Sequence, residues 1–285
     1  MLAERHGGTI INADSAQVYR DLRIVTARPS SEEEGRAPHR LFGHVDASDD
    51  GYSAARWAAE ATVAIDRAVA AGSLPVLVGG TGLYIRTLID GIAPVPPIDP
   101  DIRAEVRAMN REDAWQALSQ VDRDEAARLN PADTTRVARA LETARSTGRT
   151  LHEWRRDRVG AIGPRIDLTA TILLPPREWL NERIDRRFAQ MVQQGAMDEV
   201  AVLDARTDIP EGAPIRRAIG MPELAAVARG EIALDEAIAR ASLATRQYAK
   251  RQYTWFRNQP PVDWTRTDEL DNFTQLSKIE TRLHD

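Results

Sequence analysis

The chain has 285 residues, a formal net charge of −5 and 42% hydrophobic residues, so it is long enough for one large domain or for a core with an inserted lobe. It has no cysteine, which excludes disulfides, thiol nucleophiles and cysteine metal sites, and its five scattered histidines lack the HExxH spacing of a zinc site. The net negative charge argues against a uniformly basic nucleic-acid binder, although an average charge does not describe local patches. No stretch approaches about 18 uninterrupted apolar residues and the N-terminus does not resemble a signal peptide, so we expect a cytoplasmic protein without membrane contact.

Residues 1–8 are predicted to form the last turn of a helix, closed by Gly7 and Gly8. A chain that opens in the last turn of a helix suggests that a strand and most of a helix precede Met1. We therefore expect the sequence to be truncated at its N-terminus.

The first predicted strand lies around Ile10 and Ile11, within residues 8–29 (GTIINADSAQVYRDLRIVTARP). A short apolar run that ends in polar residues is typical of a parallel strand that delivers functional groups to its C-terminal edge. Asp14 is the first catalytic candidate, because a carboxylate at that edge can accept a proton or bind a ligand. Alternatively, Asp14 only caps the segment that follows it.

A helix is predicted over residues 53–72, with Ser53 as its N-cap and Gly72 at its end, and an apolar strand over residues 74–78 follows. The apolar residues expected on one face of this helix are Trp57, Ala61, Ile65 and Val69. The strand then runs into a glycine-rich turn.

That turn is Gly79-Gly80-Thr81-Gly82, and a helix follows it. The layout is typical of a parallel α/β sheet that binds ligands at the ends of its strands. The glycines would let a ligand approach the backbone, and Thr81 adds a hydroxyl. Tight strand-to-helix turns also need glycine for steric reasons alone, so both interpretations stay open.

A proline-rich stretch over residues 93–100 marks a domain boundary. Residues 101–158 then show helical spacing and no strand pattern, and Asp133 is predicted to cap the helix over residues 134–147. The expected domains are a discontinuous core over residues 1–96 and 164–285 and a helical insertion over residues 97–163.

Strand character returns over residues 166–174, and the next helix carries Arg183 and Arg187 on one face. These two arginines could clamp an anionic group at the C-terminal edge of the sheet. Alternatively, they form a solvated helix face that pairs with acidic neighbours. Further helices follow, and residues 262–264 are predicted as a short last strand.

The stretch ATRQYAKRQYTWFR, residues 244–257, contains four basic residues and no acid, with aromatic residues between them. On a helix, Arg246 and Lys250 share one face. Tyr248 and Trp255 share another, so one side can pack while the other meets phosphates. Contact with RNA is one interpretation, and an ordinary amphipathic helix with a basic solvent face is the other.

The chain contains no GxxxxGK[ST] phosphate loop, because its first lysine is Lys250. In that motif, backbone N–H groups, a lysine and a hydroxyl together hold phosphate and magnesium. The strand and glycine turn over residues 74–82 cannot replace it, because they lack the lysine. The adjacent Arg216 and Arg217 are ambiguous between phosphate contact and an ordinary surface role.

Seven segments, in this order, resemble the tRNA dimethylallyltransferase (isopentenyltransferase) family. They are NADSAQVYRDLRIVTARP, PHRLFGH, LPVLVGGTGLYIR, DTTRVARALE, PPREWLNERIDRRF, RRAIG and ATRQYAKRQYTWFR. The resemblance implies an α/β fold: a P-loop kinase-like three-layer core with a parallel sheet, plus a helical insertion domain that contacts tRNA.

The resemblance implies transfer of a dimethylallyl group from dimethylallyl diphosphate to N6 of adenosine 37, in tRNAs that read codons starting with U. The implied partner is the tRNA anticodon stem-loop, the implied cofactor is Mg2+, and the implied state is a monomer. The chemistry is coherent with this, because the adenine must leave the loop stack to react. Its exocyclic amine is a poor nucleophile, which a hydrogen-bonding carboxylate and a magnesium-neutralised leaving group would help.

The resemblance also assigns roles to residues. Asp14 matches the carboxylate that accepts the adenine N6 proton, and Arg217 matches the arginine that helps hold the diphosphate. Arg183 and Arg187 are further candidates for diphosphate binding, and no residue of this chain is expected to bind the metal. The positions that match tRNA-contacting regions are Asp14, Ser15, Ala16, Gln17, Thr81, Arg103, Thr135, Arg136, Val137, Ala138, Arg139, Arg246, Lys250 and Arg251.

The chain departs from the family pattern in two ways. The family's first strand and phosphate loop should precede Leu2, so we expect the chain as it stands to be inactive or nearly so. The Gly-Tyr that often follows the catalytic arginine is replaced by Gly220-Met221-Pro222, which affects a detail of the substrate channel.

Two alternative functions stay open on the residues alone. One is a small-molecule phosphotransferase on the same fold, suggested by the helix that carries Arg183 and Arg187. The other is a non-catalytic tRNA-binding protein, which would keep the RNA contacts without the phosphate loop.

Overall fold

The computed structural model describes residues 1–284, and the chain divides into two compact units. The core unit comprises Met1–Arg86 and Arg165–Asp285, and the insertion unit comprises Thr87–Pro164. The division falls within helix α4 (Gly82–Asp90). The residues between α4 and the proline-rich stretch belong with the insertion unit, because Ile92 and Val159 exchange backbone hydrogen bonds, each 3.0 Å long.

The core unit is built on a parallel three-stranded sheet in the order β2-β1-β3. The strands are β1 (Thr9–Asn12), β2 (His39–Arg40) and β3 (Pro75–Val78). Ile11 is completely buried in the central strand, which confirms the predicted buried strand. Asn12 pairs in register with Val78, so the chain leaves β1 and β3 at the same edge of the sheet. This edge brings Asp14 next to the glycine turn.

Three helices accompany this sheet: α1 (Leu2–Arg5), α2 (Ser31–Arg36) and α3 (Ala54–Ala70). Ser53 caps α3 as predicted, since its side chain accepts the N–H of Arg56. Trp57 is completely buried, but Val69 is 61% exposed, so its predicted place on the buried face is wrong. Three helical turns take about eleven residues, so Ala68 and not Val69 returns to the face of Trp57.

The second half of the core unit contains a two-stranded parallel sheet of β4 (Thr171–Leu173) and β5 (Thr265–Thr267). The predicted strand over residues 166–174 shortens to three residues. The predicted strand over residues 262–264 is wrong, and Val262 is 97% exposed. The strand starts at Thr265 instead, because Arg266 donates hydrogen bonds to the carbonyls of Pro260 and Pro261 and so folds the preceding segment into a turn.

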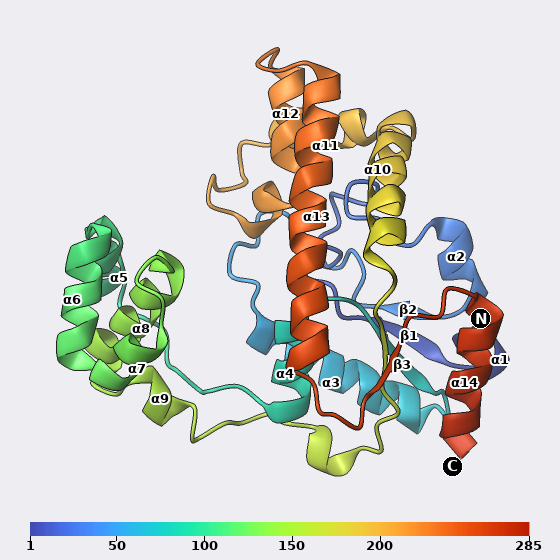
Figure 1. Ribbon diagram of the computed structural model, residues 1–285, viewed down its shortest axis with the longest axis horizontal. Coiled ribbons are helices and arrows are strands. Elements are labelled where there is room, and N and C mark those ends of the chain that lie inside the picture. Colours follow the sequence, from blue (N-terminus) through green and yellow to red (C-terminus); the bar gives the residue numbers. More distant parts are fainter. Residues whose placement is uncertain (285) are drawn as a thin grey trace. The chain divides into compact units, whose positions relative to one another are not determined.

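Five helices complete the core unit, and Figure 1 shows α13 running alongside α10 and α12. They are α10 (Arg177–Gln193), α11 (Ala196–Asp204), α12 (Met221–Ala228), α13 (Leu234–Asn258) and α14 (Asn272–His284). A short 3-10 helix spans Pro214–Arg217. Arg246 of α13 pairs with Asp185 of α10, which ties the two long helices together. Helix α14 has no counterpart in the sequence prediction.

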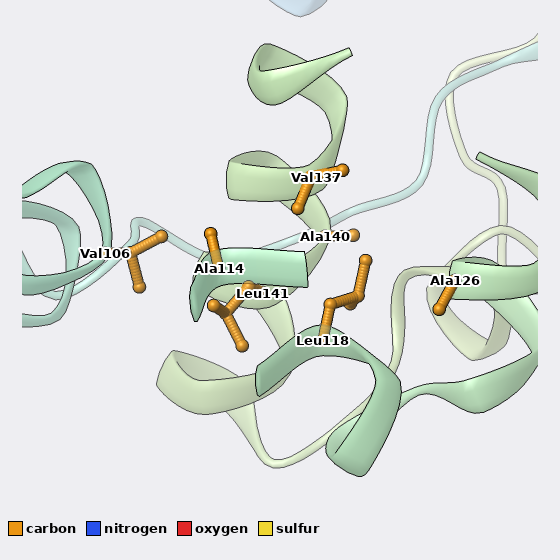
Figure 2. Close-up of a cluster of buried hydrophobic side chains, with 7 residues drawn as sticks. All are labelled: Val106, Ala114, Leu118, Ala126, Val137, Ala140 and Leu141. Atoms are coloured by element: carbon orange, nitrogen blue, oxygen red, sulfur yellow. The ribbon is translucent and has the colours of Figure 1, made fainter. Parts of the chain in front are cut away.

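The insertion unit is helical, as residues 101–158 predicted. Its helices are α5 (Pro100–Ala108), α6 (Arg111–Val121), α7 (Arg123–Arg128), α8 (Thr134–Thr147) and α9 (Leu151–Trp154). Asp133 caps α8 as predicted, and Gly148 ends it in the left-handed conformation (φ 68°). Figure 2 shows the apolar cluster that holds α5, α6, α7 and α8 together, which includes Leu118, Val137 and Leu141. The unit therefore has a small core of its own.

Candidate active site

Asn12 fixes the backbone that carries Asp14. Its side chain is buried, accepts the N–H of Asp14 at 2.8 Å, and donates to the carbonyls of Asp14 and Leu41 at 2.9 Å each. The indole N–H of Trp57 donates to the Asn12 carbonyl at 2.9 Å. Sequence reasoning missed Asn12 as a site residue. The available signal was an amide at the end of an otherwise apolar strand, where a buried polar side chain needs partners.

The Asp14 carboxylate is a stronger base than an ordinary aspartate. Burial raises the pKa of Asp14, while hydrogen bonds from the backbone of Ala16 and Gln17 and the positive charge of Arg187 oppose the rise. One carboxylate oxygen accepts the Ala16 N–H at 2.8 Å. Asp14 therefore caps its own turn and also lines a cavity, so the two interpretations of this residue do not exclude each other.

The glycine turn after β3 packs against protein, and this packing explains its glycines. A Cβ on Gly79 would lie 2.3 Å from the carbonyl carbon of Ala13, and one on Gly82 would lie 2.4 Å from the Trp255 ring. Thr81 accepts the Ser15 N–H at 2.9 Å through its hydroxyl, and Thr81 N–H donates to Ala13. The steric interpretation of the glycines is supported, and Thr81 joins the turn to the Asp14 loop.

A cavity of about 520 Å3 lies in the core unit at this edge of the sheet. Its volume is in the usual range for small-molecule sites. Three arginines line it together with Asp14: Arg187 of α10, Arg217 of the 3-10 helix and Arg251 of α13. The cavity is also lined by the apolar Val25, Phe188, Met191, Ile215 and Ile219, by the tyrosines Tyr19, Tyr52, Tyr84 and Tyr248, and by the loop residues Ser15, Ala16 and Thr81.

The three cavity arginines form no ion pair within residues 1–284. Arg217 donates to the Gly212 carbonyl, and Arg251 stacks on Tyr248. Burial and the neighbouring charge of Arg183 lower the pKa of Arg187, and Asp14 opposes this. Unpaired guanidinium groups around a partly apolar cavity favour an anionic ligand with an apolar part.

In each of two pairs of arginines whose roles the sequence left open, one member lines the cavity and the other does not. Arg187 lines the cavity, whereas Arg183 lies outside it, over the Trp179 ring at 5.4 Å. Arg217 lines the cavity, whereas Arg216 is structural: it pairs with Asp204 at 3.3 Å and donates to two backbone carbonyls.

The remaining predicted contact residues lie in different surroundings. Gln17 donates to the carbonyls of Thr26 and Ala27 at 3.0 Å, so its side chain is used within its own loop. Lys250 is exposed on α13, while Arg246 is engaged with Asp185 as described above. Met221, at the departure from the family pattern, is 2% exposed and packs at the start of α12.

The predicted contact residues of the insertion unit belong to α5 and α8. Arg103, Thr135, Arg136 and Arg139 are exposed, and Ala138 is half-buried. Val137 requires a correction, because its side chain is 1% exposed and belongs to the apolar cluster in Figure 2. Its side chain has no surface to offer to RNA.

Glu199 of α11 holds the far end of the Asp14 loop and was not predicted. Its carboxylate accepts the backbone N–H groups of Arg23, Ile24 and Val25, with distances of 2.9 Å to both Ile24 and Val25. Three consecutive N–H groups on one carboxylate form an anion-binding nest that the protein fills itself. Val25 and Thr26 line the cavity, so Glu199 shapes one of its walls.

Replacing Glu199 with alanine is expected to lower the free energy of unfolding by about 2–3 kcal/mol, because three backbone donors lose a charged acceptor. Chemical denaturation measures this change. Asp198→Ala is the matched control, since Asp198 is exposed in the same helical turn and should cost less than about 1 kcal/mol. Equal losses from the two variants would contradict the structural role of Glu199.

A second cavity of about 630 Å3 lies beside α3, and we do not assign the chemistry to it. Its one carboxylate, Glu60, is already satisfied by Tyr52 at 2.7 Å, His44 at 2.9 Å and Arg56 at 3.2 Å. Burial raises the pKa of Asp14, whereas hydrogen bonds from Tyr52, His44 and Arg56 outweigh the burial of Glu60 and lower its pKa, so the carboxylate suited to accept a proton is the one at the Asp14 cavity.

The amino-acid sequence is similar to a known protein family along most of its length. A family model described as IPP transferase matches residues 17–259. A protein named tRNA dimethylallyltransferase from Sphingopyxis alaskensis is 54% identical over 98% of this chain and 90% of its own length. Another of the same name, from Novosphingobium aromaticivorans, is 54% identical over 96% of each chain.

The chain belongs to the IPP transferase family. The full-length tRNA isopentenylpyrophosphate transferase from Bacillus halodurans superposes with a TM-score of 0.70 at 34% identity, covering 100% of this chain and 89% of its own. A eukaryotic dimethylallyltransferase acting on tRNA gives a TM-score of 0.76 at 29% identity, over 90% of this chain and 65% of its own. These structures confirm the predicted P-loop kinase-like α/β fold.

No helix within residues 1–284 is long and apolar enough to cross a membrane. The same residues contain no group of three or more histidine, aspartate or glutamate side chains that could hold a metal ion.

Proposed function

We propose that this chain is a tRNA dimethylallyltransferase that joins a dimethylallyl group to N6 of adenosine 37. The observation that carries the proposal is the cavity at the end of β1, which is lined by a carboxylate with a raised pKa, by apolar side chains and by three arginines that form no ion pair within residues 1–284. The family membership of the chain supports the same reaction class, prenyl transfer.

The lining of the cavity suits both parts of dimethylallyl diphosphate. Arg187, Arg217 and Arg251 can bind the diphosphate through charge-assisted hydrogen bonds. The apolar side chains of Phe188 and Met191 offer the dimethylallyl group a surface away from water. Arg183 does not line this cavity, so its proposed part is limited to its effect on Arg187.

The transfer forms one bond and breaks another. The adenine N6 amine attacks C1 of the dimethylallyl group, the C1–O bond breaks, and diphosphate leaves with its electron pair. The N6 proton passes to the Asp14 carboxylate, whose raised pKa makes it a better acceptor at neutral pH. The Asn12 side chain holds the Asp14 backbone in place for this step.

The tRNA partner and Mg2+ are further parts of the proposal. Ser15, Ala16 and Thr81 line the same cavity as Asp14, where a flipped adenine would enter. Mg2+ commonly takes most of its ligands from substrate phosphates and water, so a diphosphate substrate can bring the ion into a site without a dedicated set of protein ligands. The proposed active form is a cytoplasmic monomer.

The test is a transfer assay on the chain itself and on the longest polypeptide that its gene encodes. Each is incubated with dimethylallyl diphosphate, Mg2+ and an anticodon stem-loop with adenosine 37, and the nucleosides are separated by mass spectrometry. We expect N6-(dimethylallyl)adenosine from the longest form and none from a stem-loop with guanosine at that position. Nucleotide phosphorylation instead would support a phosphotransferase, and binding of the stem-loop without transfer would support a non-catalytic RNA binder.

A further inference from the structure

The insertion unit buries a carboxylate that its core does not need. Glu142 of α8 is 1% exposed, between the completely buried Leu141 and Thr143. Glutamate is almost never fully buried unless it is paired, because an ion loses several kcal/mol of hydration in the interior. An apolar side chain would fill this position at a lower cost, so the carboxylate requires an explanation.

Glu142 accepts a hydrogen bond from the Nε of an arginine on the neighbouring helix. Arg107 Nε of α5 donates to Glu142 at 3.0 Å, while the Arg107 side chain is 66% exposed. Its two Nη groups make no hydrogen bond to any residue within 1–284. The buried oxygen thus fixes the direction of the guanidinium and leaves its outer donors facing solvent.

Two more arginines lie near this ion pair, on the same two helices. Arg103 lies one turn before Arg107 on α5, and Arg139 lies one turn before Glu142 on α8, which packs against α5. Partial desolvation lowers the pKa of the exposed Arg139, Glu142 opposes this, and the charges of Arg103 and Arg107 lower the pKa further. The charges of Arg103 and Arg107 therefore reach Arg139, and Glu142 is the acid that opposes them there.

This arrangement has more positive charge than the fold requires. One arginine would be enough to neutralise Glu142. Two like charges one turn apart, such as Arg103 and Arg107 on α5, destabilise the helix that carries them. Neither Arg103 nor Arg139 makes an ion pair with any residue that the structure describes. The same two helices also contain an ordinary ion pair, Arg145 with Glu105 at 2.7 Å, so unpaired arginines are not the rule between them.

We propose that Glu142 is a positioning residue that aims Arg107, so that Arg107, Arg103 and Arg139 form a preorganised site for one phosphate of an RNA backbone. The proposal rests on the proposed function, and it adds Arg107 and Glu142 to the residues that the sequence singled out. Guanidinium groups bind phosphate through paired hydrogen bonds, and such contacts fix the register of an RNA on a protein. A bound phosphate would also supply negative charge to Arg103 and Arg139, which make no ion pair within the described residues.

The test measures affinity for the anticodon stem-loop as a function of salt concentration, by fluorescence anisotropy with the full chain. Arg107→Ala should weaken binding about 5- to 10-fold and lower the slope of log Kd against log salt by about one, as expected for one lost phosphate contact. Arg145→Ala is the charge-matched control on the same helices and should change the affinity less than about 2-fold.

Glu142→Leu separates the effect of charge from that of positioning. Leucine removes both the negative charge and the acceptor for Arg107 Nε, so charge alone predicts tighter binding, whereas loss of positioning predicts binding about 3-fold weaker or more. If Glu142 acts through Arg107, the double variant should bind no more weakly than Arg107→Ala alone. Thermal unfolding shows whether each variant is folded, and Glu142→Asp, which keeps the charge, should restore part of the affinity.

The outcomes separate this inference from the proposed function. Normal binding by the Arg107→Ala and Glu142→Leu variants, or tighter binding by Glu142→Leu, would overturn the phosphate site and leave the tRNA substrate intact. If the unaltered chain does not bind the stem-loop at any salt concentration, the tRNA assignment fails and this inference fails with it.

Discussion

Replacing Asp14 with asparagine is expected to reduce dimethylallyl transfer by about 100- to 10,000-fold, which is the usual contribution of a positioned general base. Asparagine keeps the size of the side chain and can still accept the Ala16 N–H, but it cannot accept the N6 proton. The measurement is the single-turnover rate in the longest polypeptide that the gene encodes. The affinity for the stem-loop should change little, so unchanged turnover would remove Asp14 from the catalytic role.

The same substitution should make the protein more stable at neutral pH. Burial raises the folded-state pKa of Asp14 above its unfolded value, so the ionised form destabilises the fold at pH values above the folded pKa. Asp14→Asn removes that cost, and a gain of about 1 kcal/mol, or ~2–4 °C in Tm, is typical for relief of a strained site. The gain should shrink as the pH falls through the raised pKa, because the native carboxyl then takes up its proton. A constant gain at every pH would contradict the burial argument.

Arg217 and Arg216 are adjacent in sequence, but replacing Arg217 should reduce activity, whereas replacing Arg216 should reduce stability. Arg217→Ala removes a cavity cation and is expected to lower transfer about 100- to 1,000-fold, the scale of losing one preorganised charge at the reacting group. Its free energy of unfolding should stay within about 0.5 kcal/mol of the unaltered protein, since its side chain makes one hydrogen bond at an exposed position.

Arg216→Ala is the matched control and should act on stability. It removes an ion pair with Asp204 and hydrogen bonds to the carbonyls of Arg206 and Ile209, so we expect a loss of about 2 kcal/mol. Calorimetric titration with dimethylallyl diphosphate and chemical denaturation should be done on both variants. Weak diphosphate binding by Arg216→Ala with full stability would reverse the two assignments.

Much of this fold could be predicted because its strongest signals are local. The central strand around Ile11, the Ser53 cap and the Asp133 cap depend on residues within a few positions of one another, and all three are confirmed. The predictions failed at the ends of helices and strands, where a shift of one or a few residues changes which side chain is buried or where the element starts. Val69 lies one position beyond the buried face of its helix. The last strand starts at Thr265, because the segment after Pro260 and Pro261 first forms a turn.

The site could be predicted only in part, for a similar reason. Asp14 could be found because it ends a strand, and the motif order supplied its family. Glu199 could not be identified as a support of the Asp14 loop, because its partners are backbone groups that only the folded chain brings near. Asn12 offered a local signal, an amide at the end of an apolar strand, but its contact with the carbonyl of Leu41 needs the folded chain. Glu142 ends the DTTRVARALE segment, but its role could not be predicted, since an acid on an amphipathic helix looks like a solvent residue until its burial is known.

The sequence by itself determined the family, the strand that presents Asp14 and the helical nature of the insertion. These depend on residue order and on periodicity, which a linear chain already contains. The tertiary structure decided which member of each arginine pair serves the cavity. Arg187 and Arg217 line it, while Arg183 and Arg216 are used elsewhere. It also decided that the glycines after β3 serve close packing, because steric contact and burial arise only when distant segments meet.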